Sequence, residues 1–178
     1  MPEVYDGWYC MRMNAVLAPI EEYLETDYSP DREFVDGTVV ERHVGDRSHS
    51  LVQGNVHYSL RSHYPGLFIW PEQRVRTTPS RCRIPDVCVT AQDPLTDIFE
   101  TPPLICIEIL SRRDEISNVL EKLEEYAAAG VRYIWVVDPR RRKAFYYDGG
   151  LREVTSSVLA TTGEPLVELP LADVFLGL

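Results

Sequence analysis

Two acidic residues fall where a carboxylate is hard to accommodate. Glu108 is the single acid in the apolar run Leu104–Leu110, which is predicted to be a strand buried on both faces. Asp86 follows Pro85 at the start of another apolar run. A buried carboxylate without a partner costs several kcal/mol, so the fold must place a positive charge opposite Glu108.

A divalent cation would supply that charge. Two strands joined by the loop 92–103 can bring Asp86 and Glu108 to one point. Hard oxygen ligands in this arrangement suit Mg²⁺ or Mn²⁺, which bind one or two carboxylates and keep several waters. The net charge of -10 is consistent with a site that concentrates carboxylates, and it argues against general high-affinity coating of nucleic acid.

Lys122 is the third candidate. It is predicted to lie on the helix after the Glu108 strand, one position off an apolar stripe that includes Val119 and Tyr126. Its long side chain can therefore extend along the sheet toward the end of that strand.

Each of these residues also has an ordinary structural interpretation. Asp86 could be a turn or strand-edge acid, and Lys122 could be a solvated helix lysine. Glu108 could instead meet Arg74 or Arg76 in a buried ion pair.

Periodicity and turn residues predict the elements that would position these side chains. Helices are expected over 15–28, 46–63, 114–129 and 171–176, strands over 67–77, 83–90, 104–110 and 133–137, and hairpins over 32–42 and 143–155. The unit 104–138 predicts a right-handed parallel crossover. We therefore expect an α/β protein with a mixed sheet flanked by helices and with N-terminal and C-terminal hairpins. Residues 1–14 would be a tail and residues 15–178 a single domain.

Hydropathy, the N-terminal sequence and the cysteine spacing indicate the cellular compartment that we expect. No run of 18 or more apolar residues predicts a membrane span, and the N-terminus lacks the basic and apolar segments of a secretory signal, so we expect a cytoplasmic protein. The four cysteines lack metal-site spacing, so buried thiols are expected rather than zinc ligands or disulfides; they are Cys10, Cys82, Cys88 and Cys106.

The order of these motifs resembles a known superfamily. The matching segments are Pro85-Asp86, Glu108 with Ile109-Leu110-Ser111, Lys122 with Tyr126, and the run from Ala129 to Pro139. They look like the PD-(D/E)xK nuclease superfamily and, within it, the large bacterial family of predicted restriction endonucleases. The similarity extends from about Leu17 to Phe175 and includes Glu33 and His49. One departure is clear, because Leu110 stands where the superfamily lysine would be.

The resemblance implies a restriction-endonuclease-like fold that hydrolyses DNA phosphodiester bonds with Mg²⁺ or Mn²⁺. Asp86 and Glu108 would be the metal ligands. Lys122 matches a lysine that has migrated to the following helix, where it would orient water or stabilise charge on the phosphate. Glu33 matches an early family acid, although it could equally be an exposed hairpin residue. Asn118 stands where many relatives have Asp.

DNA would be the partner, and its contacts would be local. Arg74, Arg76 and Arg83 lie just before Asp86 and are the preferred candidates. The basic run 140–143 could also contact phosphates or form a solvated turn. His49 could assist catalysis, but a surface or packing role is favoured.

Two further expectations concern the whole molecule. The edge offered by the hairpin 143–155 makes a homodimer plausible. The alternative function is a catalytically silent binding or assembly module on the same fold, motivated by the acidic net charge and by Asn118.

Overall fold

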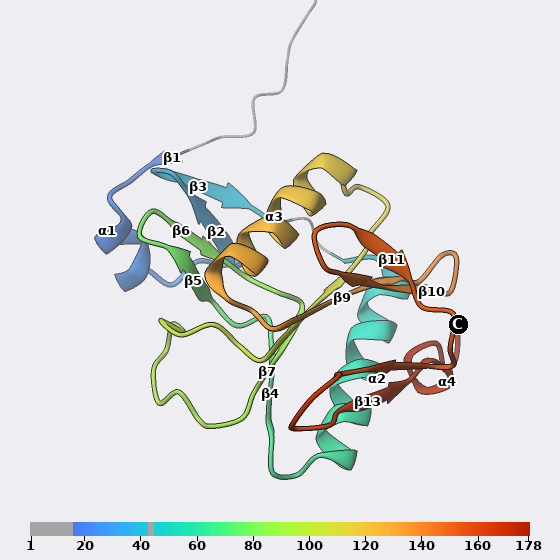
Figure 1. Cartoon of the computed structure of the whole chain (residues 1–178). Helices are drawn as coiled ribbons and strands as arrows, with labels where there is room; N and C mark the ends of the chain where they lie inside the picture. The colour runs from blue at the N-terminus through green and yellow to red at the C-terminus, as the bar shows by residue number, and fades with distance from the viewer. Residues whose placement is uncertain (1–15, 43–44) are drawn as a thin grey trace, which may run out of the picture.

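The computed structural model describes residues 16–42 and 45–178. The described residues form short strands and four helices, of which α2 and α3 are the longest (Figure 1). The elements in chain order are β1 (Val16–Leu17), α1 (Ile20–Glu25), β2 (Arg32–Val35), β3 (Thr38–Glu41), α2 (Arg47–His63), β4 (Phe68–Pro71), β5 (Val75–Thr78), β6 (Arg81–Arg83), β7 (Val87–Thr90), β8 (Ile105–Ile109), α3 (Ile116–Ala129), β9 (Tyr133–Asp138), β10 (Lys143–Tyr147), β11 (Leu151–Glu153), β12 (Val158–Ala160), β13 (Glu168–Pro170) and α4 (Leu171–Val174).

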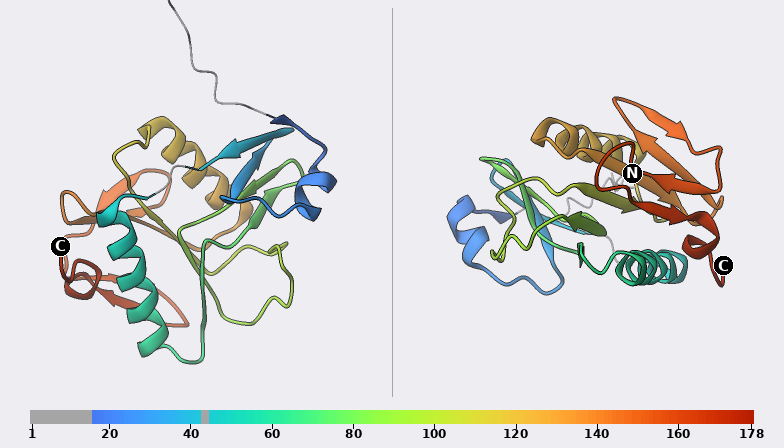
Figure 2. Two further views of the ribbon diagram at one scale, coloured as in Figure 1. Left: turned by 180° about the vertical axis from the view of Figure 1, so that it is seen from behind. Right: turned by 60° about the horizontal axis from the view of Figure 1, so that its bottom comes forward.

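The strands form three sheets. A six-stranded sheet has the order β11-β10-β9-β8-β7-β4, a five-stranded sheet has the order β1-β3-β2-β6-β5, and β12 pairs with β13. Only β8 and β9 pair in parallel among these ladders, through the crossover helix α3. Helices α2 and α3 cover opposite faces of the six-stranded sheet, as the right-hand view of Figure 2 shows. The expected α/β architecture with a mixed sheet is confirmed.

Strand β8 is buried on both faces, as its composition predicts. Ile105, Ile107 and Ile109 join the apolar cluster that α2 completes, whereas Cys106 joins the cluster under α3. Side chains alternate along a strand, so Glu108 faces α3, the helix that carries Lys122.

The chain passes from one sheet to the other at two places where the sequence predicts a continuous strand. The segment 67–77 divides into β4 in the six-stranded sheet and β5 in the five-stranded sheet, and the segment 83–90 divides likewise into β6 and β7. Glu72 adopts a left-handed backbone with φ 50°, and Pro85 has no N–H for a ladder. Both single-strand predictions are therefore wrong, and the second break places Asp86 between the two sheets.

Several local predictions are confirmed. Asp36 and Gly37 both adopt positive φ, 47° and 86°, and join β2 to β3 in a tight hairpin. Asp46 caps α2 by accepting a hydrogen bond from the His49 N–H. The hairpin of β10 and β11 pairs in the expected register, with Tyr147 opposite Leu151.

Other boundaries differ from the prediction. The segment 15–28 is not one helix: of its described residues, 16–17 form strand β1 and 20–25 form the short helix α1. Strands β12 and β13 were not predicted, and α4 is shorter than expected. The predicted tail 1–14 and Cys10 lie outside the described residues, whereas Cys82, Cys88 and Cys106 are buried free thiols, as predicted. In the part of the chain that is described, no helix has the length and apolarity to cross a membrane.

Candidate active site

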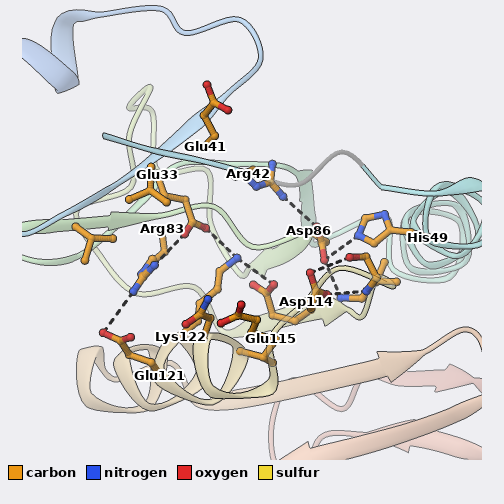
Figure 3. Close-up of a pocket in the computed structure, with 17 residues that line it drawn as sticks. Glu33, Glu41, Arg42, His49, Arg83, Asp86, Asp114, Glu115, Glu121 and Lys122 are labelled. Atoms are coloured by element: carbon orange, nitrogen blue, oxygen red, sulfur yellow. Dashed lines mark hydrogen bonds and ion pairs between the residues drawn. The ribbon is translucent and has the colours of Figure 1, made fainter. Parts of the chain in front are cut away.

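A cleft of about 300 Å³ opens where the two sheets meet, and it gathers most of the predicted site residues. Its walls come from the β2–β3 hairpin, the first turns of α2, the segment before β7, the end of β8 and one side of α3 (Figure 3). Asp86, Glu108, Lys122 and Glu33 all line it. Residues distant in sequence converge here because the second sheet crossing, at 83–87, and the first turns of α3 both border the cleft.

Asp86 is held from several sides. One carboxylate oxygen accepts a 2.7 Å hydrogen bond from the Ile109 N–H, which ties Asp86 to the residue after Glu108. The Arg42 guanidinium lies 3.0 Å from its other oxygen, and His49 Nε2 lies 3.3 Å away. Burial alone would raise the pKa of Asp86, but His49, Lys122 and Arg42 hold the pKa below its ordinary value. Asp86 is therefore a buried, ionised carboxylate.

Glu108 is the less well compensated acid. Its Oε2 accepts a 3.0 Å hydrogen bond from Lys122 Nζ, and its Oε1 accepts a 2.8 Å hydrogen bond from the Tyr126 hydroxyl. Burial raises its pKa to about 7 against the opposing effect of Lys122, and the nearby charges of Asp86 and Glu33 add to the rise. The alternative in which Arg74 or Arg76 pairs with Glu108 is wrong, because the partner is Lys122.

Lys122 occupies the centre of the cleft and is not a solvated helix residue. Its ammonium group donates to the Ile84 carbonyl at 2.9 Å and lies 2.9 Å from Glu33 and 3.0 Å from Glu108. Burial disfavours its charged form, but Glu108, Glu33 and Asp86 raise its pKa above the ordinary value. Three acceptors therefore fix a charged lysine between two strands.

Glu33 is buried and not an exposed hairpin residue. It meets Lys122, Arg83 at 3.0 Å and the Ile84 N–H at 3.1 Å. Although burial opposes ionisation, Lys122 and Arg83 lower its pKa to about 2. Arg83 also donates to Glu125 from α3 at 2.8 Å, so this end of the cleft is a closed ion-pair network.

Sequence reasoning missed four of these contacts. Arg42 carries no local signal, since it follows β3 and reaches Asp86 only through the tertiary fold. Glu125 has no expected role from the sequence, and Tyr126 enters only as part of the apolar stripe and of the family resemblance, without its contact to Glu108. His49 was expected at a surface or packing position, yet it is buried and contacts Asp86. The Asp46 cap, which places His49 at the third helical residue, was the available signal.

The three arginines predicted to contact DNA lie in different environments. Arg83 lines the cleft, but its guanidinium is committed to Glu33 and Glu125. Arg74 donates to the Thr26 carbonyl, and Arg76 donates to the Pro79 carbonyl and pairs with Glu100. Arg74 and Arg76 do not line the cleft. DNA contact by these residues stays a prediction.

The donor set fits a small divalent cation of the Mg²⁺ type. Within 16–42 and 45–178 no group of three or more His, Cys, Asp or Glu side chains is arranged as a metal cage. Mg²⁺ does not require one, because it is usually held by one or two carboxylates and keeps several waters. The raised pKa of Glu108 marks a position where the chain supplies too little positive charge.

The fold and the cleft together define a class of protein. A mixed sheet flanked by helices, with Asp86, Glu108 and Lys122 converging at one point, is the arrangement of a PD-(D/E)xK-like nuclease. The family model for Uma2, described as "Putative restriction endonuclease", matches residues 20–177, and the chain belongs to this family.

A solved structure supports the fold. The chain is similar to the crystal structure of a protein from Anabaena variabilis described as a "putative nuclease belonging to DUF820", with a TM-score of 0.74 and 19% sequence identity. The alignment covers 89% of this chain and 97% of that chain. No curated protein matches the sequence.

Proposed function

We propose that the protein is a metal-dependent endonuclease that hydrolyses phosphodiester bonds in DNA. The observation that carries this proposal is the position of Lys122. A lysine from α3 reaches Glu108 at 3.0 Å, while Asp86 binds the N–H of the next residue, Ile109. Two carboxylates and an ammonium group thus share one cleft although they come from three elements.

The residues have separable roles in this reaction. Asp86 and Glu108 would hold Mg²⁺ or Mn²⁺. When bound, the ion acts as a Lewis acid toward the phosphate and lowers the pKa of a bound water. Lys122 holds a proton and a positive charge at Nζ, where it can orient water or stabilise charge on a phosphate oxygen. Tyr126 fixes the second oxygen of Glu108, and the Ile109 N–H and His49 fix Asp86.

Plasmid nicking tests the proposal. The wild-type chain should nick supercoiled DNA with Mg²⁺ or Mn²⁺, and Asp86→Asn and Glu108→Gln should each abolish nicking. Lys122→Ala should reduce it strongly, because loss of a charge-stabilising group typically costs 10²–10³-fold. Glu124→Gln is the matched control, since Glu124 is an exposed acid of α3 outside the cleft. Nicking that survives both acid substitutions would rule the assignment out.

A second candidate is a catalytically silent binding or assembly module. The chain's own cations already meet both acids, with Arg42 on Asp86 and Lys122 on Glu108, so the cleft can be held together without a metal ion. This candidate predicts no divalent-ion binding in calorimetry. Saturable Mn²⁺ binding that is lost in the Asp86→Asn, Glu108→Gln double variant would exclude it.

The predicted homodimer belongs with the proposal. Strand β11 is an outer strand of the six-stranded sheet, and its three residues are exposed. An unpaired strand edge of this kind can pair with a second copy. Light scattering at micromolar concentration should show a dimer, and a monomer would refute the expectation.

A further inference from the structure

Five exposed arginines lie beside the cleft on three short segments. Arg47 begins α2, and Arg112 and Arg113 lie in the connection after β8. The connection after β9 holds Arg140, Arg141 and Arg142, of which Arg142 is set apart because it donates to the Leu178 carbonyl. We call this set the arginine rim: Arg47, Arg112, Arg113, Arg140 and Arg141. The side chains of Arg112 and Arg141 are 78% and 76% exposed, so they are available to a partner.

The topology explains why these segments meet. Strands β8 and β9 run parallel with Ile109 opposite Val137, so the connections that follow them leave at the same edge of the sheet. The start of α2 reaches the same place, because Arg112 Nε lies 3.8 Å from the Asp46 cap. The views of Figures 1 and 2 agree that these three segments occupy one side of the molecule.

The arginine rim is continuous with the cleft. Ser111 and Asp114 line the cleft, and Arg112 and Arg113 lie between them in the chain. His49, two residues after Arg47, lines the cleft. A strand that docks on the rim would therefore pass the mouth of the site that holds Asp86.

The acids near the rim are committed to ordering its backbone. Asp46 accepts from the His49 N–H and Asp114 accepts from the Ser111 N–H. Asp138 is buried and accepts from the N–H groups of Arg140 and Arg141. These hydrogen bonds hold the connecting segments in place. Asp138 also lies 3.9 Å from Arg140 Nε and 3.6 Å from Arg141 Nη1, as Asp46 lies 3.8 Å from Arg112 Nε, but the three arginine side chains stay 48–78% exposed.

We infer that the arginine rim is the surface on which the phosphate backbone of DNA docks. This inference rests on the proposed endonuclease function and names its substrate-binding surface. Arginine forks match phosphate oxygens, and a chain with net charge -10 repels polyanions except where positive charge is concentrated. The sequence favoured Arg74, Arg76 and Arg83 over the run 140–143. Arg74 and Arg76 lie outside the cleft and donate to main-chain carbonyls, and Arg83 lines the cleft but is paired with Glu33 and Glu125.

Binding of a labelled duplex to the full chain in EDTA tests the inference without cleavage. The variant Arg112→Gln, Arg113→Gln, Arg141→Gln should bind at least ~10-fold more weakly at 0.1 M salt, and its salt slope should fall by about three, since each lost phosphate contact removes about 0.9. The matched control is Arg61→Gln, Arg132→Gln, Arg152→Gln, which removes the same charge from exposed positions elsewhere and should keep at least half of the affinity. The double variant Arg74→Gln, Arg76→Gln tests the prediction made from the sequence: weaker duplex binding by this variant would support it, and unchanged binding would contradict it.

The outcomes separate this inference from the endonuclease proposal. Three results would overturn the inference that the arginine rim binds DNA. They are equal weakening of duplex binding by the rim and control variants, no effect of the rim variant, and no duplex binding by the wild type. A polyglutamate peptide of equal charge that binds as tightly as the duplex would also overturn it. Duplex binding that depends on the rim, with no nicking in Mg²⁺ or Mn²⁺, would keep the rim and reject the nuclease.

Discussion

Glu33 and Glu108 are buried carboxylates at two ends of one cleft, and both lie within 3.0 Å of Lys122. Their pKa values move in opposite directions, to about 2 for Glu33 and about 7 for Glu108. Burial opposes ionisation of both acids. Glu33 has a second cation, Arg83, and a backbone N–H, whereas Glu108 has only a hydroxyl group beside Lys122 and feels the charge of Asp86.

The difference separates a structural end of the cleft from a binding end. At the structural end, made by Glu33, Arg83 and Glu125, the chain neutralises its own acids. At the binding end, made by Asp86 and Glu108, burial and mutual repulsion leave a demand for further positive charge. On the proposed function, a metal ion would supply at this end the positive charge that Arg83 supplies at the other end.

The largest effect should come from breaking the structural end. Arg83→Ala leaves Glu33 and Glu125 without their buried partner, so the free energy of unfolding should fall by about 3–5 kcal/mol. Urea denaturation at pH 7 measures the change. Arg152→Ala, which removes an exposed ion pair with Asp148, should change stability by less than about 1 kcal/mol. A similar small loss in Arg83→Ala would show that the network is not structural.

Neutralising an acid at the binding end should raise the free energy of unfolding, whereas breaking the structural end lowers it. Because the pKa of Glu108 is raised to about 7 in the folded state, its protonation favours folding below pH 4.5, and this contribution is lost as pH rises through about 7. Glu108→Gln should therefore stabilise the metal-free protein by about 3 kcal/mol at pH 8 and by less than about 1 kcal/mol at pH 5.

Glu33 provides the comparison for that measurement. Its lowered pKa contributes stability that is present above pH 4.5 and lost as pH falls toward 2, so Glu33→Gln should destabilise the protein at pH 8. Denaturation curves of both variants across pH 5–8 give the two signs. If the two variants shift stability in the same direction, the contrast between the ends of the cleft is wrong.

Metal binding should depend on pH at the binding end. A proton on Glu108 competes with the cation, so Mn²⁺ should bind about tenfold more tightly at pH 8 than at pH 6. Calorimetry in two buffers of different ionisation enthalpy should also detect proton release at pH 6. Affinity that is constant from pH 6 to pH 8 would contradict the raised pKa of Glu108.

The smallest effect concerns Arg42, which lies 3.0 Å from the oxygen of Asp86 that does not bind Ile109. Its guanidinium competes with a cation, so Arg42→Ala should tighten Mn²⁺ binding about fivefold, equivalent to about 1 kcal/mol. Arg32→Ala is the control, because Arg32 pairs with Glu41. Weaker metal binding in Arg42→Ala would mean that Arg42 supports the carboxylate rather than competing for it.

Local patterns in the sequence were sufficient for much of the scaffold. Alternation along 104–110 predicted which face of β8 carries Glu108, and Asp36-Gly37 predicted the first hairpin. The helix predicted over 46–63 begins at the Asp46 cap, and the helix predicted over 114–129 ends at Gly130, which has a left-handed backbone. These features depend on residues a few positions apart, so the chain determines them without reference to the rest of the fold.

The sequence by itself determined that Asp86, Glu108 and Lys122 are unusual and that a nuclease-like α/β fold accommodates them. Only the tertiary structure decided how their charges are balanced. The two sheet crossings, the contact of Arg42 with Asp86 and the use of Arg83 for Glu33 and Glu125 join distant parts of the chain. Periodicity indicates which face of a strand or helix a residue occupies. Contacts between distant elements are set by packing, and these contacts give Glu33 two cationic partners, Lys122 and Arg83, but give Glu108 only Lys122.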